Sequence, residues 1–332
     1  MPIMWMNWMN LPPQEGLYCS NYQNYLRRTI MKNGQQWKDI HGNYIQAHGG
    51  CILKYNGIYY WYGEHKGADN CPNSRRVDVI GVSCYISKNL VDWEYKGLVL
   101  EAVKDNPESY LHPSKVLERP KVIYNAKTQK FVMWMHMDSA DYKLASAGIA
   151  IADNPEGPFK LLKVKRPNNQ ELRDMTLYKD VDDIAYLIYS TDHNNTISID
   201  KLTEDYTDLE GSSTFAMVNQ MREAAAVCFH GNKYYMVTSG CTGWKPNSTL
   251  YSTSDHIMGS WKLIDNPCEG ENYRITFYGQ STYIFEADNR LFLILDHWNA
   301  NDLKCSGYSI LPIEFDEDGI MHINWCSDWD GI

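Results

Sequence analysis

The sequence predicts an all-β fold, and more specifically a five-bladed β-propeller with a short N-terminal extension. One pattern recurs five times: a polar or charged residue opens an apolar strand, a short turn follows, and an aromatic-rich strand closes the hairpin. The openings lie roughly 50 to 70 residues apart, a spacing typical of propeller blades rather than of helical solenoids. Long helical periodicity is absent. The openings are residues 46–50, 118–120, 173–174, 222–224 and 279–281.

The chain divides into an extension, residues 1–40, and one propeller domain, residues 41–332. The extension shows little strand pattern, and we expect it to pack on the outside of the ring. A chain of this length can bury a sizeable core. A β-sandwich is the main competing fold, but it would not be expected to repeat the polar opening in register.

Each blade is expected to contain four strands, the unit that propellers repeat. In the first blade, Asn56 and Gly57 lie between two apolar runs, which is the strongest short signal for a hairpin. The expected inner hairpins are residues 51–55 with 58–62, 121–124 with 131–135, 175–178 with 185–189, 226–229 with 234–238, and 282–285 with 291–295. Outer strands are expected at residues 80–87, 93–97, 147–152 and 309–315.

Closing the ring would bring all five openings to one end of a central channel. Glu118, Asp174, Glu223 and Gln280 lie far apart in the sequence, each at one opening. The predicted topology therefore gathers them in one polar pocket.

Composition narrows the range of partners. The chain has 11 Trp, 24 Tyr and 8 Phe, which suits stacking on sugar rings, although β-proteins are in general rich in these residues. The formal net charge of −10 makes nucleic acids and anionic membranes poor partners. No run is long and apolar enough to span a bilayer. Oligomeric state is not addressed by the sequence.

The cysteines and the start of the chain bear on location. There are nine cysteines, an odd number, and none forms a Cys-x-x-Cys pair, which indicates free thiols in a reducing compartment. The first residues lack the features of a secretion signal. We therefore expect a cytoplasmic protein, or a secreted one if a leader has been removed.

Carboxyl groups from different blades could carry out hydrolysis of a glycosidic bond. That reaction needs an acid to protonate the leaving oxygen and a group on the opposite face to act on water or the sugar. Glu223 is the first choice for the acid, since burial beside the apolar residues 224–227 would raise its pKa. The alternative is a structural pair with Arg222.

The remaining polar candidates each have a functional and a structural interpretation. Asp174 and Glu118 could hold sugar hydroxyls or tune the acid, but structural hydrogen bonds are commoner at strand starts. Glu64 could recognise a hydroxyl or form a surface salt bridge. Trp244 could stack on a sugar or cover the edge of the core, and Trp298 and Trp325 invite the same two interpretations.

No cofactor or metal is expected. His48 and His297 could line the channel, but a lone histidine is more often a hydrogen-bonded core residue than a ligand. The sequence contains no recognisable metal-ligand or phosphate-binding motif.

Eight short stretches together resemble glycoside hydrolase family 43, and within it the exo-acting galactan 1,3-β-galactosidases. They are GNYIQAHGG at residues 42–50, YYWYGE at 59–64, ERPKV at 118–122, RDM at 173–175, REA at 222–224, SGCTGW at 239–244, QST at 280–282 and WNANDL at 298–303. The resemblance covers the chain from about residue 40 and implies a five-bladed propeller that hydrolyses with inversion.

The resemblance also implies roles for individual residues. Glu223 matches the general acid, and Glu118 matches a third acidic residue that assists the site. Residues 46–50 offer no counterpart of the first-blade Asp that most of the family uses as base. The subfamily is thought to use a glutamine of the last blade instead, and Gln280 matches it. Positions expected to hold the terminal galactose are matched by Glu64, Tyr142, Asp174 and Thr242.

A glutamine base is chemically unusual. An ordinary amide is a very poor base because its nitrogen lone pair is delocalised. Gln280 would have to orient water through its carbonyl oxygen, or react as an imidic-acid tautomer with a basic nitrogen.

The function expected from these observations is that of an inverting exo-β-1,3-galactosidase. Its partner would be β-1,3-galactan or an arabinogalactan-derived oligosaccharide. Another family 43 activity is the first alternative, such as α-L-arabinofuranosidase or β-xylosidase. The second is a non-catalytic glycan-binding propeller, which the missing first-blade Asp favours.

Overall fold

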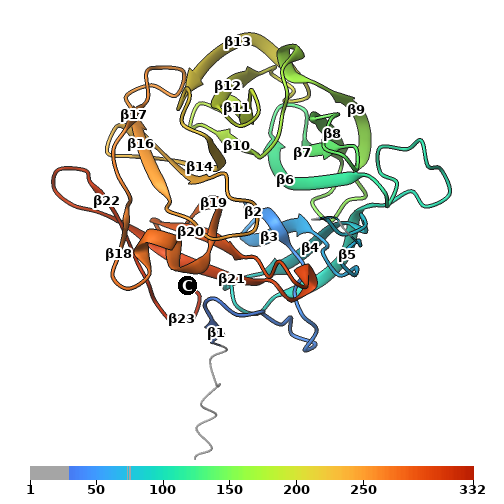
Figure 1. The fold of residues 1–332 in the computed structure, drawn as a ribbon, viewed down its shortest axis with the longest axis horizontal. Coiled ribbons are helices and arrows are strands. Elements are labelled where there is room, and N and C mark those ends of the chain that lie inside the picture. The colour runs from blue at the N-terminus through green and yellow to red at the C-terminus, as the bar shows by residue number, and fades with distance from the viewer. Residues whose placement is uncertain (1–29, 73, 75) are drawn as a thin grey trace, which may run out of the picture.

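Five β-sheets surround a central channel in the computed structural model, which describes residues 30–72, 74 and 76–332. Figure 1 looks down the channel and shows the sheets following one another around the ring in chain order. The predicted all-β, five-bladed propeller is confirmed. The helices of the described residues are three short 3-10 turns, η1 (Pro167–Asn169), η2 (Tyr273–Tyr278) and η3 (Leu303–Cys305).

The first four blades are four-stranded antiparallel sheets, as predicted. The first contains β2 (His48–Tyr55), β3 (Ile58–Glu64), β4 (Gly81–Ser87) and β5 (Glu94–Glu101). The second contains β6 (Val116–Asn125), β7 (Lys130–Asp138), β8 (Ser146–Ala152) and β9 (Lys160–Lys165). The third contains β10 (Met175–Lys179), β11 (Ala185–Thr191), β12 (Thr196–Leu202) and β13 (Leu209–Ala216). The fourth contains β14 (Arg222–His230), β15 (Lys233–Gly240), β16 (Leu250–Ser254) and β17 (Lys262–Leu263).

The fifth blade has one strand more than predicted. Its strands run in the order β18-β22-β21-β20-β19, and β18 pairs with β22 in parallel. The strands are β18 (Cys268–Glu269), β19 (Gln280–Ala287), β20 (Arg290–His297), β21 (Gly307–Phe315) and β22 (Met321–Asn324). The extra strand comes from the loop that enters the blade, so this sheet is widened at its outer edge.

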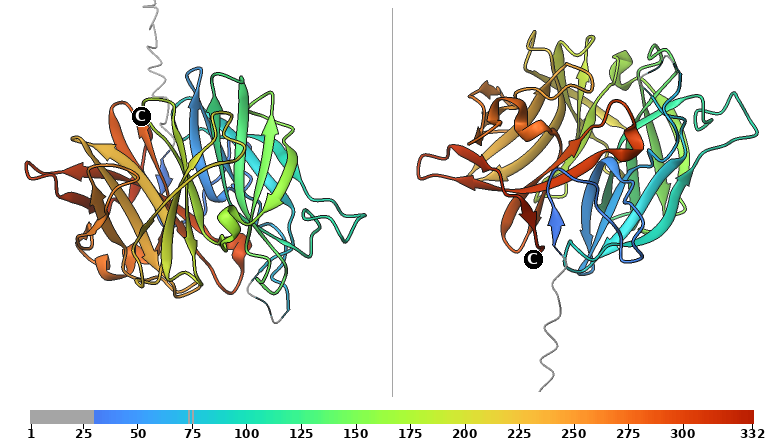
Figure 2. Two further views of the ribbon diagram at one scale, coloured as in Figure 1. Left: turned by 90° about the horizontal axis from the view of Figure 1, so that it is seen from above. Right: turned by 60° about the horizontal axis from the view of Figure 1, so that its bottom comes forward.

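The two described ends of the chain meet beside the fifth blade. A two-stranded sheet joins β1 (Met31–Lys32) to β23 (Asp328–Trp329). Figure 2 shows β1 next to the C-terminus at the periphery of the ring. Residues 1–29 of the predicted extension lie outside the described residues, and the boundary at residue 40 stays a prediction.

The hairpin predicted at Asn56 and Gly57 forms between β2 and β3. Both residues are left-handed, with φ of 49° and 76°, and the strands pair from Tyr55 and Ile58 onward. Two left-handed central residues match the right-handed twist of the flanking strands, which explains the preference for Asn and Gly here.

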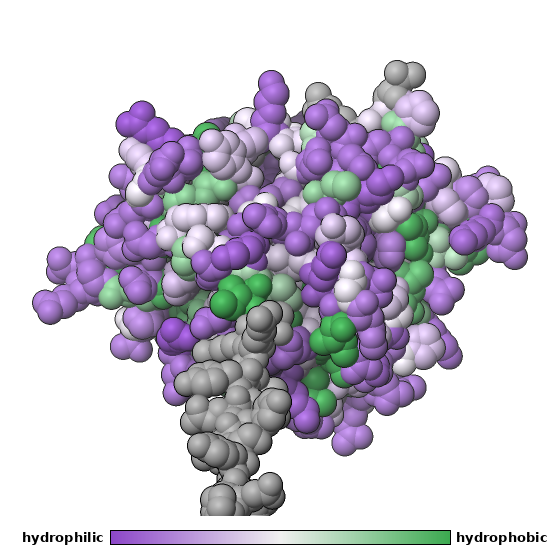
Figure 3. Space-filling view, turned by 90° about the horizontal axis from the view of Figure 1, so that it is seen from below, coloured by the Kyte–Doolittle hydropathy of each residue, from purple (hydrophilic) through white to green (hydrophobic). Residues whose placement is uncertain are grey.

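Large aromatic side chains fill the space between the first and last blades. Trp37, Trp61, Trp93 and Tyr308 are almost completely buried in one cluster. Figure 3 shows that one outer face is mostly hydrophilic, with a few separate apolar patches. Among the helices of the described ranges, none is long and apolar enough to span a membrane.

A β-bulge near the start of the inner strand recurs in four blades and positions the polar openings. A bulge sets two residues of one strand opposite one residue of its partner. The register shifts after His48, Glu118, Glu223 and Ser281. The next residue is left-handed in three of these blades, with φ of 58° at Gly49, 53° at Arg119 and 54° at Ala224. His48, Glu118 and Glu223 therefore occupy equivalent positions in their blades.

Candidate active site

A cavity of about 370 Å³ lies where the blade openings converge. Six of the eight predicted site residues line it: Glu118, Tyr142, Asp174, Glu223, Trp244 and Gln280. The other lining residues are Arg119, His136, Arg173, Asn194, Cys241 and Gly243. The topology thus brings together the four opening residues that the sequence pattern singled out.

Glu223 is a carboxyl group held mainly in its neutral form. Burial raises its pKa to about 8, the charge of Asp174 adds to the effect, and Arg119 opposes it. The amide nitrogens of Gln280 and Asn194 donate to its two oxygens, at 3.1 and 3.3 Å. A carboxyl that keeps its proton near neutral pH is what a general acid requires.

Glu118 is held in the opposite state. It accepts hydrogen bonds from the Tyr142 hydroxyl at 2.8 Å and from Nδ1 of His136 at 3.2 Å. Burial opposes its ionisation, but the hydrogen bond from His136 and the charge of Lys66 outweigh burial and lower its pKa to about 2. Their surroundings therefore keep Glu223 neutral and Glu118 anionic in the same pocket.

His136 connects Glu118 to a second buried carboxylate. Its Nε2 lies 2.9 Å from Asp138, so both ring nitrogens face carboxylate oxygens. Burial favours the neutral ring, but the bonds to Asp138 and Glu118 outweigh it and raise the pKa of His136 to about 9. A charged His136 donates to both carboxylates and fixes the orientation of Glu118.

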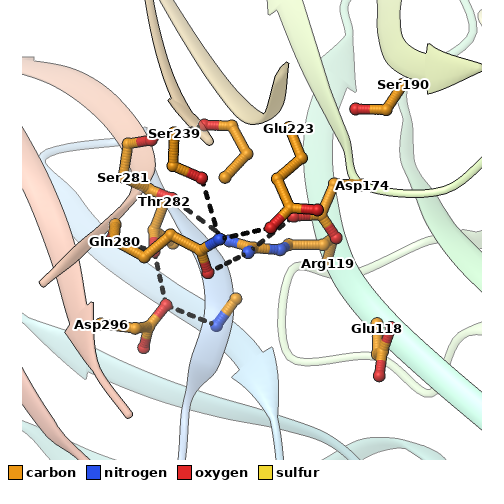
Figure 4. Close-up of polar contacts among 12 residues, drawn as sticks. Glu118, Arg119, Asp174, Ser190, Glu223, Ser239, Gln280, Ser281, Thr282 and Asp296 are labelled. Carbon is orange, nitrogen blue, oxygen red and sulfur yellow. Dashed lines mark hydrogen bonds and ion pairs between the residues drawn. The ribbon is translucent and has the colours of Figure 1, made fainter. Parts of the chain in front are cut away.

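Arg119 links Asp174 to Gln280. Figure 4 shows its guanidinium lying between Asp174 and Gln280. Its Nη2 lies 2.8 Å from the Asp174 carboxylate and 2.6 Å from Oε1 of Gln280, and its Nη1 donates to the carbonyl of Ser281 at 3.2 Å. Arg119 is 5 % exposed, so these bonds are shielded from water.

Gln280 and Glu223 touch directly through the 3.1 Å contact between Nε2 and Oε1. In inverting glycosidases the two catalytic groups stand roughly 6.5 to 9.5 Å apart, which leaves room for a water. An anomeric carbon and a water fit between these side chains only if the contact opens. Whether Gln280 serves as the base stays a prediction.

His48 occupies the first-blade position that corresponds to Glu118 and Glu223, and it does not line the cavity. It is completely buried, with Nδ1 3.0 Å from Asp296 and Nε2 2.9 Å from the Tyr308 hydroxyl. The first opening therefore supplies a hydrogen-bonded core histidine in place of a carboxylate. His297 is also paired, 2.7 Å from Ser309, and burial lowers its pKa to about 4.

Two predicted substrate-binding residues do not line the cavity. Glu64 is buried, accepts a hydrogen bond from the backbone N–H of Arg119 at 2.9 Å and pairs with Lys66 at 2.5 Å. Glu64 therefore holds the backbone of Arg119 in place without lining the cavity itself. The hydroxyl of Thr242 donates to the carbonyl of Lys245 in an exposed loop.

Several cavity residues were not singled out from the sequence. One of them, His136, had a signal in the sequence, because His136 and Asp138 are two polar residues two apart on the apolar strand β7 and share one face. Asn194 comes from a loop and had no such signal, whereas Cys241 lies inside the stretch SGCTGW at residues 239–244 that carries the family resemblance. Burial and then the charge of Glu223 raise the pKa of the Cys241 thiol to about 12, so it stays protonated.

No cluster of three or more His, Cys, Asp or Glu side chains suited to a metal occurs in residues 30–72, 74 and 76–332.

Several solved structures of similar fold are described as β-1,3-galactosidases or exo-β-1,3-galactanases. One solved with galactodeoxynojirimycin is 35% identical with a TM-score of 0.85, covering 90% of this chain and 99% of that one. An exo-β-1,3-galactanase from Phanerochaete chrysosporium, solved with galactose, is 29% identical with a TM-score of 0.83, covering 90% and 68%. An exo-β-1,3-galactanase from Clostridium thermocellum is 32% identical with a TM-score of 0.80, covering 91% and 66%.

No curated protein matches the sequence of this chain. A family model does match it. The model of glycosyl hydrolases family 43 matches residues 48–321, from the first inner strand into the last blade. This chain belongs to glycosyl hydrolases family 43.

Proposed function

We propose that this enzyme is an inverting exo-β-1,3-galactosidase that releases terminal galactose from β-1,3-galactan or arabinogalactan-derived oligosaccharides. The observation that carries the proposal is the pairing of a neutral, largely buried Glu223 with Gln280, in a propeller whose first opening has His48 in place of a carboxylate. The similar β-1,3-galactosidase and exo-β-1,3-galactanase structures support the same substrate class.

Glu223 donates its proton to the glycosidic oxygen as the bond to galactose breaks, and a water adds to the anomeric carbon from the opposite face. The proton that this water releases passes to solvent, from which Glu223 is protonated again. Because its pKa is about 8, most molecules carry this proton at neutral pH. Glu118, which is held as an anion, lies in the same pocket and stabilises the positive charge that develops on the sugar ring in the transition state. Trp244 offers a ring face to the sugar.

The exo mode of action is proposed from the likeness to the solved exo-β-1,3-galactanases. Release of single galactose units from the end of an oligosaccharide, with no internal cleavage, is the outcome expected of that mode.

We also propose that the enzyme works in a reducing compartment on imported short oligosaccharides. All eight cysteines of the described residues are free, which supports a cytoplasmic location. Cell fractionation with an antibody to the chain tests this. Recovery outside the cytoplasm would contradict it.

Galactose release from β-1,3-galactobiose tests the proposed function. The wild-type enzyme should release galactose, and Glu223→Gln, which keeps the shape but not the acidic proton, should lose at least about 100-fold in kcat/KM. Faster turnover of nitrophenyl α-L-arabinofuranoside or β-xyloside would favour another family 43 activity. Calorimetric binding of the disaccharide without any product would favour a glycan-binding propeller.

A further inference from the structure

The Gln280 side chain has all of its hydrogen-bonding capacity in use. An amide oxygen can accept two hydrogen bonds, and an amide nitrogen can donate two. Oε1 accepts from Arg119 at 2.6 Å and from Nε1 of Trp298 at 2.8 Å. Nε2 donates to Glu223 at 3.1 Å and to the Ser239 hydroxyl at 2.9 Å. Figure 4 shows the amide surrounded by Ser239, Glu223 and Arg119.

The orientation of this amide follows from the chemistry of its partners. A guanidinium and an indole N–H can only donate, so the group that faces Arg119 and Trp298 must be the oxygen. An imidic-acid O–H would meet two donors at that position. A water molecule would find no free lone pair on the oxygen. In this arrangement Gln280 therefore acts as a hydrogen-bond donor toward Glu223.

The two donors are held by different means. Arg119 is fixed by Asp174 and by the carbonyl of Ser281. Trp298 lies in the loop after β20, and its ring packs between His48 and Trp244, with ring centroids 5.4 and 5.0 Å away. Since His48 is itself locked in the core, Trp298 connects a rigid part of the first blade to Gln280.

We propose that Trp298 is a positioning residue for the acid: its indole N–H holds the oxygen of Gln280, and this keeps the Gln280 amino group on Glu223. The proposal depends on the proposed function only in assigning the acid role to Glu223. Trp298 does not line the cavity, so this effect on Glu223 is separate from stacking on a sugar.

The variant Trp298→Phe tests this role, because phenylalanine keeps an aromatic ring and removes the N–H. Loss of one hydrogen bond should lower kcat about 3- to 10-fold, with KM changed less than about twofold. The bond from Gln280 lowers the pKa of Glu223, so loosening the amide should move that pKa upward. Trp325→Phe is the matched control, since Trp325 is 39 % exposed and does not line the cavity.

The pKa of Glu223 can be measured without substrate, by carbon NMR of protein labelled at the glutamate carboxyl and assigned with Glu223→Gln. This separates failure of the positioning role from failure of the proposed function, which is read from wild-type galactose release. Unchanged kcat and unchanged Glu223 pKa in folded Trp298→Phe would overturn the proposal, as would a rise in KM alone.

A double-mutant cycle with Gln280→Ala gives a second, independent test. Gln280→Ala alone should raise the pKa of Glu223, and adding Trp298→Phe should produce little further change in that pKa. If Trp298→Phe does not fold, Gln280→Ala decides: an unchanged Glu223 pKa would show that the amide does not act on the acid. Additive effects in the double variant would likewise overturn the proposal.

Discussion

Because Glu223 is held neutral in the folded protein, it should lower the stability of the enzyme as pH rises. The substitution Glu223→Gln should remove this dependence on pH. The pKa of Glu223 is raised from 4.5 to about 8, so the folded protein binds this proton more tightly than the unfolded chain does. Between these two values the unfolded chain loses the proton first, and Glu223 destabilises the fold increasingly as pH rises. Each unit of pKa corresponds to about 1.4 kcal/mol, so the full penalty is about 5 kcal/mol above pH 8.

Glu223→Gln has no proton to lose, so it should escape this penalty. The free energy of unfolding of the variant should rise relative to wild type by about 4 kcal/mol between pH 5 and pH 9. Urea unfolding of both proteins at pH 5, 7 and 9 measures the difference. Glu317→Gln, at an exposed site, controls for the change in net charge. A difference between variant and wild type that is independent of pH would refute the assignment of Glu223 as a neutral buried acid.

Three further outcomes follow from the same geometry. The wild-type kcat/KM should fall above about pH 8, where Glu223 loses its proton. Because the pKa of Glu118 is about 2, its protonation should not lower kcat/KM at any pH above 4. A bell-shaped profile centred near pH 5 would contradict this. His136→Ala should leave the carboxylates of Glu118 and Asp138 without their shared partner. The free energy of unfolding, measured by urea denaturation, should fall by about 3 to 5 kcal/mol. A loss below 1 kcal/mol would show that His136 is not a charged partner of these carboxylates. Trp244→Ala should raise KM for galactobiose about 3- to 10-fold with a smaller change in kcat, and a change in kcat alone would argue against stacking.

The fold was predictable where its signals are local. The Asn56 and Gly57 turn and the five inner hairpins depend on alternation and turn chemistry over a few residues, and they form as expected. The parallel strand β18 and the pairing of β1 with β23 were not predictable. Both involve two-residue strands that join distant parts of the chain, so no sequence periodicity reports them.

The site was predictable to the extent that ring closure determines it. Glu118, Asp174, Glu223 and Gln280 converge because each opens a blade, and a closed ring places all openings at one end. The bonds that decide their chemistry depend on side-chain conformations and loop positions. Sequence spacing therefore could not show that Arg119 bridges Asp174 and Gln280.

Proton NMR of the first galactose released from β-1,3-galactotriose tests the central claim most directly. Inversion at a β-linkage, with Glu223 as acid, predicts that α-galactose appears first and that one galactose leaves before any disaccharide is cut. If β-galactose appeared first, the reaction would retain configuration, which requires a nucleophilic carboxylate close to Glu223. That result would contradict the inverting mechanism.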